Sequence, residues 1–371
     1  MSNGRIREFF PGGNTSLGFF SYYDYIIAPD ATRIFIIKGG PGVGKSSFMK
    51  AIANELNEQG FDIELHHCSS DPDSLDGLVF PQIGVAMIDG TSPHVVDPHN
   101  PGAVDEILHL GDYWDEEGIR QGKQEILALN QEVGRLFRRA YRYLKAARAI
   151  HDDQKAIYSE GLNLGLANEK AADLIEAIFE GRPVSRKAGK VRKLFASAIT
   201  PVGFRNFLTN LIEPVATIYA VQGQPGTGKS TLLGKLSIAA EERGMDCEAF
   251  YCALDPYKLE HLVIPDLDVA VTTAVEPHRV DLTKATAIMN MDECLNPELP
   301  EKQGAVSKEN QVLFEILMKN AVSTITEAKS VHDKMEEYYI PHMNFAVIGE
   351  LRHRTVARIL KYAAEVAPSF V

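Results

Sequence analysis

Two stretches of the sequence have the residue types and the spacing of a phosphate-binding loop. The first runs from Gly39 to Ser46 and reads GGPGVGKS, and the second runs from Gly223 to Ser230 and reads GQPGTGKS. Both match the pattern GxxxxGK[ST], and each follows an apolar run and precedes a helical pattern, which is the context that this motif requires. The sequence therefore predicts two nucleotide-binding sites.

Each residue type in these loops has a defined chemical task. Glycines let the backbone turn until several N–H groups point at the same phosphate oxygens. A lysine, here Lys45 or Lys229, places a cation beside the β- and γ-phosphates, and a serine hydroxyl, Ser46 or Ser230, binds Mg²⁺. The following helix adds its positive N-terminal dipole. The predicted nucleotide-binding residues are Gly39, Gly40, Pro41, Gly42, Val43, Gly44, Lys45, Ser46, Ser47, Gly223, Gln224, Pro225, Gly226, Thr227, Gly228, Lys229, Ser230 and Thr231.

The surroundings of the two loops also resemble each other. Residues 39–97 align with residues 223–281 without a gap, and about 23 of the 59 aligned positions are identical. Further matches extend toward both ends of the chain, and a Pro/Gly/basic stretch at 181–190 has the composition of a linker. We therefore predict a tandem duplication, with one P-loop NTPase domain and its helical extension in residues 1–184 and a second in residues 185–371.

The order of apolar runs in each half predicts the α/β class. A strand, a helix and a second strand at this spacing imply a parallel right-handed crossover. The expected fold is a duplicated P-loop domain with a mostly parallel sheet flanked by helices. In the first half the expected elements are a helix beginning near Thr15, the loop strand 34–37, a helix at 45–59, and strands at 61–67 and 83–88. Their counterparts are a helix near Thr200, a strand at 218–221, a helix at 229–243, and strands at 245–251 and 267–272.

Each half is expected to end in a long helical extension. Apolar residues recur at helical spacing from Ile126 to Ala147, and more loosely from Val312 to Tyr338. Corresponding His-Asp pairs at 151–152 and 332–333 align these extensions with each other. The expected partner of each apolar stripe is the long helix of the other half.

A phosphate loop also needs a carboxylate that holds the metal ion. Four apolar residues lead to Asp89, which is the expected form of the metal-binding strand, although Asp89 also precedes a glycine, as turn residues do. The counterpart of Asp89 is Thr273, which has no carboxylate, so the two sites are expected to be non-equivalent. Asp292 and Glu293 end another apolar run and are the alternative in the second half. That run aligns with 108–112, so the third strand of each half has two candidate positions.

Two further pairs of residues recur in both halves. Asp71 and Asp255 each precede a proline. In many P-loop kinases an acidic residue at this position faces the acceptor substrate. Asp-Pro is also typical of the start of a helix, where the aspartate is the N-cap. A histidine and an aspartate three residues apart also follow the buried strand, and they either sense the γ-phosphate, bind a metal or fix the loop. These residues are His94 with Asp97, and His278 with Asp281.

Composition limits the partners. A net charge of −12 disfavours nucleic-acid binding through bulk charge, but residues 135–148 form one strongly basic helix. This helix is either a solvated face or a contact for an acidic protein, a nucleic acid or the nucleotide of the other half. Four cysteines without a Cys-x-x-Cys pair predict neither a zinc site nor a disulfide framework. No apolar run approaches the roughly 18 residues of a membrane span, and a cytoplasmic protein is expected.

The strings GGPGVGKSS and GQPGTGKST, together with the recurring DPxxL and PHxxD strings, resemble a little-characterised bacterial family of predicted ATPases with two tandem P-loop domains. The resemblance covers essentially the whole chain. It implies ATP binding and hydrolysis and a cytoplasmic location, and it implies no substrate. The absence of an Asn-Lys-x-Asp string also favours ATP over GTP.

The leading hypothesis is therefore a Mg²⁺-dependent ATPase with two nucleotide sites, in which Lys45, Lys229 and Asp89 are catalytic and Ser46, Ser230 and Asp89 hold the metal ion. Nucleotide binding or hydrolysis is expected to change how the halves pack. One alternative is a small-molecule kinase whose acceptor lies near Asp71 or Asp255. Another is a nucleotide-gated adaptor with negligible turnover.

Overall fold

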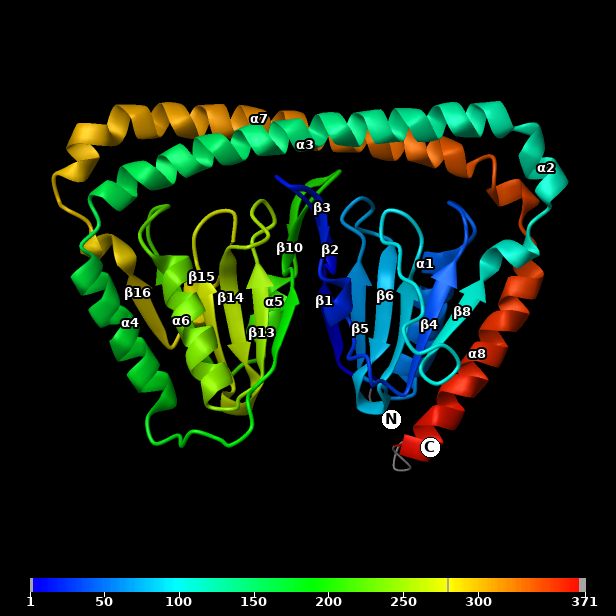
Figure 1. The fold of residues 1–371 in the computed structure, drawn as a ribbon, viewed down its shortest axis with the longest axis horizontal. Helices are drawn as coiled ribbons and strands as arrows, with labels where there is room; N and C mark the ends of the chain where they lie inside the picture. The colour runs from blue at the N-terminus through cyan, green and yellow to red at the C-terminus, as the bar shows by residue number, and fades with distance from the viewer. Residues whose placement is uncertain (1–2, 279, 367–371) are drawn as a thin grey trace.

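The computed structural model describes residues 3–278 and 280–366, and it contains two six-stranded sheets side by side beneath a pair of long helices (Figure 1). The first sheet consists, in spatial order, of β1 (Ile6–Phe9), β5 (Ile63–His67), β6 (Leu75–Phe80), β7 (Val85–Asp89), β4 (Arg33–Lys38) and β8 (Asp105–His109). The second consists of β9 (Val191–Leu194), β13 (Cys247–Tyr251), β14 (Leu259–Ile264), β15 (Val269–Thr273), β12 (Thr217–Gln222) and β16 (Ala287–Asn290). Strand by strand, the two sheets have the same order.

Both sheets are mixed, with one antiparallel strand in each. β6 and β14 run antiparallel to both of their neighbours, while the other neighbouring strands are parallel. β4 lies between β7 and β8, and β12 lies between β15 and β16. Both candidate positions for the third strand are therefore occupied by strands, on either side of the strand that leads into each phosphate loop.

The prediction of a helix that begins near Thr15 is wrong, because Thr15 closes a hairpin. β2 (Gly12–Thr15) and β3 (Gly18–Ser21) pair antiparallel, and the Thr15 hydroxyl accepts a hydrogen bond from the Leu17 amide and donates one to the Gly18 carbonyl. Gly18 has a φ of 103°, a left-handed conformation that lets a glycine close a tight turn. The helix predicted near Thr200 is wrong for the same reason, since β10 (Ser197–Thr200) and β11 (Gly203–Asn206) form the corresponding hairpin.

The sequence Asp-Pro after the second strand marks a turn rather than a helix start. The Asp71 carbonyl accepts a hydrogen bond from the Ser74 amide, and its carboxylate accepts one from the Ser74 hydroxyl at 2.8 Å. The next residue begins β6, which the sequence reasoning did not predict. A short polar turn and a helix cap use the same residue types, which explains the error.

The helices that follow the phosphate loops lie where the sequence predicts them. They are α1 (Lys45–Glu58) and α6 (Lys229–Glu242). The shorter helices are α2 (Glu116–Gln121) and α5 (Leu208–Ile212). Brief 3₁₀ turns lie at Tyr23–Tyr25, Pro81–Ile83, Leu110–Tyr113, Pro265–Leu267, Leu282–Lys284, Met291–Cys294 and Ile340–His342.

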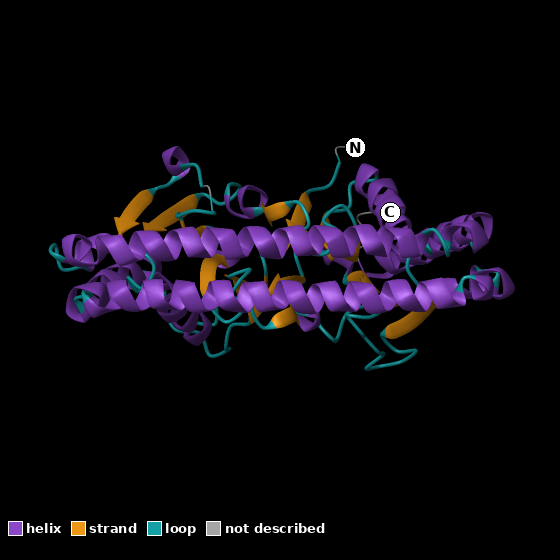
Figure 2. Cartoon of the chain, turned by 90° about the horizontal axis from the view of Figure 1, so that it is seen from above, coloured by secondary structure: helices purple, strands orange, loops and turns teal. Residues whose placement is uncertain are grey.

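Two 38-residue helices, α3 (Lys123–Glu160) and α7 (Leu299–Glu336), lie side by side across both sheets (Figure 2). We call this pair the roof. Its buried seam is rich in alanine, which allows the helix axes to approach closely. The seam includes Ala140, Leu144, Ala321 and Ile325. The prediction that the long helix of each half packs on that of the other is confirmed.

The roof helices cross from one half to the other, so each half covers the other. α3 begins above the first sheet and ends above the second, and α7 runs the opposite way (Figure 1). α4 (Leu164–Phe179), which follows α3, packs on α6 and adds Leu174 to the core of the second half. α8 (Phe345–Val366) packs on α1 and adds Ile359 to the core of the first half.

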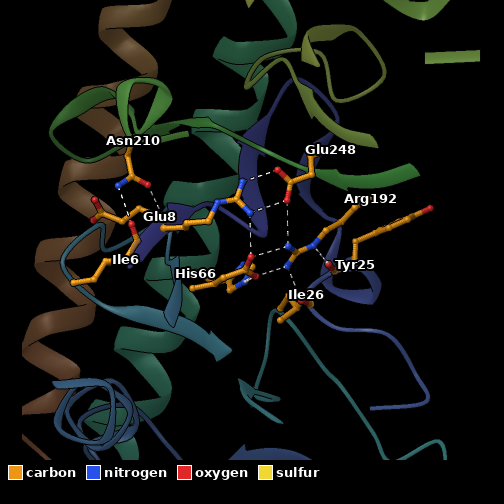
Figure 3. Close-up of polar contacts among 10 residues, drawn as sticks. Ile6, Glu8, Tyr25, Ile26, His66, Arg192, Asn210 and Glu248 are labelled. Carbon is orange, nitrogen blue, oxygen red and sulfur yellow. Dashed lines mark hydrogen bonds and ion pairs between the residues drawn. The ribbon is translucent and has the colours of Figure 1, made fainter. Parts of the chain in front are cut away.

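The two sheets meet at their inner edges through a partly buried group of charges, Arg7, Glu64, Arg192 and Glu248, here called the central charge cluster. Figure 3 shows this region around the labelled Arg192 and Glu248. Arg7 donates to Glu248 of the second half at 2.8 Å, and Arg192 donates to Glu64 of the first half at 2.9 and 2.6 Å. Beside the cluster, Phe10 and Phe195 exchange backbone hydrogen bonds of 3.0 Å. These reciprocal contacts hold the two sheets in one arrangement.

Candidate nucleotide-binding sites

The first phosphate loop holds a lysine ammonium close to its own backbone carbonyls. Gly44 caps α1 in a left-handed conformation with a φ of 91°, which a residue with a side chain rarely adopts. The Lys45 ammonium donates to the carbonyls of Gly39 and Gly40 at 3.1 and 2.8 Å. It also lies 3.6 Å from a carboxylate oxygen of Asp89. The loop therefore brings a cation and a carboxylate together at the start of a 14-residue helix.

Asp89 acts as a turn residue and also lies beside the loop. It ends β7, the neighbour of β4, and one of its oxygens accepts hydrogen bonds from the amide and hydroxyl of Thr91. The other oxygen faces Lys45. The Ser46 hydroxyl accepts a hydrogen bond from the Leu75 amide at 3.0 Å. Because hydroxyl and carboxylate oxygens are the ligands that Mg²⁺ prefers, Ser46 and Asp89 fit this ion.

A cavity of about 1270 Å³ lies between the first loop and the roof, and it is called the first cavity after this loop. Both roof helices contribute to it, so its walls come from both halves of the sequence. Its lining residues include Asp71, Asp89, Arg138, Tyr141, Lys329, His332, Glu336, Tyr339 and Arg352. Its volume exceeds the usual range for sites of drug-sized ligands, and a nucleotide fits within it.

In the second phosphate loop the lysine contacts the same two loop carbonyls as in the first, but the position that corresponds to Asp89 has no carboxylate. The Lys229 ammonium donates to the carbonyls of Gly223 and Gln224 at 2.6 and 2.7 Å. Burial, with a smaller contribution from the charge of Lys258, lowers the pKa of Lys229 to about 8. Thr273, the counterpart of Asp89, uses its hydroxyl to donate to the Glu260 carbonyl.

A different carboxylate reaches the second loop. Asp292, which follows β16, accepts a hydrogen bond of 2.7 Å from the Gln224 amide. Glu293 instead forms an exposed ion pair with Lys170 at 2.8 Å. The two halves therefore place carboxylates from different strands beside their phosphate loops.

Each loop contacts the end of the long helix from the other half. Ser159 at the end of α3 donates to the Gly226 carbonyl, and a Cβ atom on Gly226 would lie 2.3 Å from the Lys155 carbonyl oxygen. At the first loop, a Cβ atom on Gly42 would lie 3.0 Å from Ile340, which follows α7. The phosphate loops thus lie directly under the ends of the roof.

Ion pairs connect the roof to the turn that follows the second strand of each half. Arg148 of α3 lies 2.8 Å from a carboxylate oxygen of Asp255. At the corresponding positions, Lys329 of α7 lies 3.6 Å from Asp71. We call these the roof ion pairs. Asp71 and Asp255 therefore face cations from the roof, and Asp71 also lines the first cavity.

The structure separates the predicted histidine–aspartate pairs. The side chain of His94 is 8% exposed and lies 3.6 Å from Asp76, whereas the side chain of Asp97 is 77% exposed and pairs with Lys38. In the second half, His278 lies 2.8 Å from Glu260. Asp281 is exposed and caps a 3₁₀ turn by accepting a hydrogen bond from the Thr283 amide.

The basic side chains of residues 135–148 lie in different surroundings. Arg135 pairs with Glu132 on the exposed face of α3, in agreement with a solvated surface. Arg138 lines the first cavity, and Arg148 reaches the other half.

Several cavity residues were missed by the sequence reasoning. They include Asp76, Lys329, Glu336, Tyr339 and Arg352. The only signal for the α7 residues was the alignment of the two helical extensions, and that alignment did not indicate which loop each extension covers.

Comparison with known proteins supports part of this description. A family model described as the KAP family P-loop domain matches residues 20–197, which include the first loop and Asp89 but not the second loop. No curated protein matches the chain, and no solved structure matches it. Among the residues that the structure describes, every helix is too short or too polar to cross a membrane. Residues 20–197 therefore contain a KAP family P-loop NTPase domain, and this class of domain binds nucleotides.

Proposed function

From the KAP family P-loop domain at residues 20–197, we propose that the chain is a Mg²⁺-dependent ATPase with two non-equivalent nucleotide sites. The observation that carries this proposal is the first loop, where Lys45 lies 3.6 Å from Asp89 beneath a cavity of about 1270 Å³. The ATP phosphates would be bound by the loop amides and by the dipole of α1. Both sites would be covered by the roof.

The first site has a lysine and two oxygen ligands of the kinds that phosphoryl transfer uses. Lys45 would stabilise the charge that develops on the γ-phosphate in the transition state. Ser46 and Asp89 would hold Mg²⁺, whose chemistry is to bridge and neutralise the phosphate oxygens. The roof would limit the entry of bulk water, which strengthens the electrostatic interactions inside the site.

The second site is proposed to bind nucleotide with a different set of groups. Lys229 and Ser230 correspond to the residues of the first loop, while Asp292 takes the place of the carboxylate that Thr273 lacks. The buried Lys229 ammonium loses charge more readily than an exposed lysine, because burial lowers its pKa to about 8. We infer that the second site binds ATP and turns it over more slowly than the first.

We infer that the two halves arose by tandem duplication. The equal strand order of the two sheets and the corresponding positions of Arg7 and Arg192 in the central charge cluster support this origin.

The geometry favours the roof as the element that responds to nucleotide. The central charge cluster and the Phe10–Phe195 hydrogen bonds hold the sheets together, which opposes a large change in how they pack. The roof instead contacts both loops and carries the roof ion pairs. We propose that occupancy of one loop moves the helix end above it, and that the packed helices transmit the change to the other loop.

The roof ion pairs also weigh against the kinase alternative. An acceptor hydroxyl near Asp71 or Asp255 would need a carboxylate that is free to take its proton. Each carboxylate instead faces a cation from the roof. We therefore propose that water is the acceptor.

The test is phosphate release by the purified chain and by two single variants. Asp89→Asn is expected to lower the rate of release about 100-fold or more, because it removes the metal carboxylate of the first site. The exposed Asp97→Asn is the matched control and should keep the rate of the wild type. A wild type that binds ATP without releasing phosphate would favour the adaptor alternative, and full activity in Asp89→Asn would refute the assignment of the first site.

A further inference from the structure

A second cluster of chemically active side chains lies in the wall of the first cavity. It consists of Cys68, which follows β5, Asp76 in β6, and His94 in the loop after β7. One donor atom from each residue lies within 4.8 Å of the donor atoms of the other two. We call these three residues the Cys68 cluster. Three separate segments of the fold bring a thiol, a carboxylate and an imidazole together at one point.

The Cys68 cluster has unsatisfied polar atoms. Within the described part of the chain, one oxygen of Asp76 and Nδ1 of His94 have no hydrogen-bond partner, although both atoms are buried. The Asp76 residue is 4% exposed. Burying a carboxylate without a full set of partners is unfavourable. A positive charge nearby would offset this cost.

The corresponding cluster of the second half contains that positive charge. Glu260 and His278 lie at the positions of Asp76 and His94, and His261 supplies the third donor. There, the Lys258 ammonium lies 2.9 Å from the Glu260 carboxylate.

The position that corresponds to Lys258 in the first half is Ser74, which is neutral. Among the described residues, the one ion pair of Asp76 is with His94, at 3.6 Å. The first half therefore keeps three donors but lacks the lysine that neutralises the carboxylate in the second half.

A divalent cation would supply the missing charge. A thiolate, a carboxylate and a neutral imidazole carry a total charge of −2, so a bound divalent ion would leave the cluster neutral. Sulfur and nitrogen donors select Zn²⁺ and similar ions over Mg²⁺, and three protein ligands with one open position are typical of zinc sites that also bind water or substrate. The three residues line the cavity, which gives an ion a path of entry.

We propose that Cys68, Asp76 and His94 bind one Zn²⁺ ion in the wall of the first cavity, with the fourth position open to the cavity. Binding would form a sulfur–metal bond and release the thiol proton of Cys68 to solvent. The His94 ring would be held in place by Tyr23, whose ring stacks on it with centroids 4.9 Å apart. This site is separate from the Mg²⁺ ligands Ser46 and Asp89, and the inference does not rest on ATP hydrolysis.

The test is a titration of the chelator-treated full chain with Co²⁺, followed by displacement with Zn²⁺. We expect one Co²⁺ ion per chain with a thiolate-to-cobalt charge-transfer band, and loss of that band when Zn²⁺ is added. Cys68→Ser should abolish the band. Cys252→Ser, which changes the corresponding cysteine of the second half, should retain it, as should Lys45→Ala. A charge-transfer band that survives in Cys68→Ser, or no band in the wild type, would overturn the proposal.

A measurement on the wild-type chain covers the case in which Cys68→Ser does not fold. Alkylation of each cysteine is followed by peptide mass analysis, with and without Zn²⁺. Zn²⁺ should slow the modification of Cys68 at least tenfold and leave that of Cys252 unchanged. Equal rates for Cys68 with and without Zn²⁺ would refute the site.

Discussion

Removal of a single charge from the central charge cluster tests whether this cluster fixes the arrangement of the two sheets. Glu64 is 4% exposed and accepts hydrogen bonds from Arg192 at 2.9 and 2.6 Å and from Arg7 at 3.3 Å. Glu64→Gln keeps the size of the side chain and removes its charge. Both guanidinium groups, on partly buried side chains, then have only Glu248 to neutralise them.

The expected loss is about 2–3 kcal/mol of the free energy of unfolding, below the cost of leaving a fully buried charge without its partner, because the arginine side chains are partly exposed and keep Glu248. Burial alone would raise the pKa of Glu64, but Arg192 and His66 hold that pKa well below its ordinary value. The carboxylate is therefore ionised throughout the neutral range. Its contribution to stability is present above the pKa of the unfolded state and is lost only when the pH falls through the much lower folded value. The loss in Glu64→Gln should thus be the same at about pH 6 and pH 8.

The assay is urea unfolding followed by circular dichroism. Glu106→Gln is the matched control, because Glu106 forms a partly exposed ion pair with Arg358 and should cost less than about 1 kcal/mol. The double variant Glu64→Gln/Arg192→Met removes both charges and should lose less than the sum of the two single variants. A Glu64→Gln variant as stable as Glu106→Gln would refute the role given to the cluster.

Three further predictions concern the second site and the roof. The variant Lys45→Ala leaves only the second site intact. Its affinity for ATP should fall about tenfold from pH 7 to pH 9, because Lys229 loses its proton above its pKa of about 8. An affinity that does not change with pH would contradict this prediction. Asp292→Asn in the same background should weaken Mg²⁺-dependent ATP binding, and unchanged binding would remove Asp292 from the site. Arg148→Ala should speed amide hydrogen exchange in the last turns of α3, because it breaks the contact with Asp255; exchange rates equal to those of the wild type would count against the roof ion pairs.

The parts of the fold that the sequence predicted well are those fixed by local patterns. The phosphate loop requires particular residue types at fixed spacing, so the helices that begin at Lys45 and Lys229 were predicted correctly. The apolar stripe of the long helices also follows from local spacing.

Predictions from local patterns failed where the same residue type is common in two kinds of local structure. Thr15 has the side chain of a helix cap, but the glycine three residues later allows it to close a hairpin. Asp71 precedes a proline as a cap does, yet β6 follows after one turn. Only pairing with β5 and β7, which lie elsewhere in the sequence, makes this segment a strand.

Contacts between distant segments could not be predicted from one sequence. The alignment of the two halves indicated that α3 and α7 correspond, but not that each ends above the loop of the other half. The Cys68 cluster draws one residue from each of three segments, so a search for cysteine spacing does not detect it. His94 likewise pairs with Asp76 rather than with Asp97, which is closer in sequence.

The most direct test of the central claim is ATP binding by the Lys45→Ala/Lys229→Ala double variant, measured by titration calorimetry with Mg²⁺ beside the wild type and both single variants. The account predicts two binding events in the wild type, one in each single variant and none in the double variant, with unchanged circular dichroism throughout. A double variant that binds ATP like the wild type would contradict the assignment of both loops.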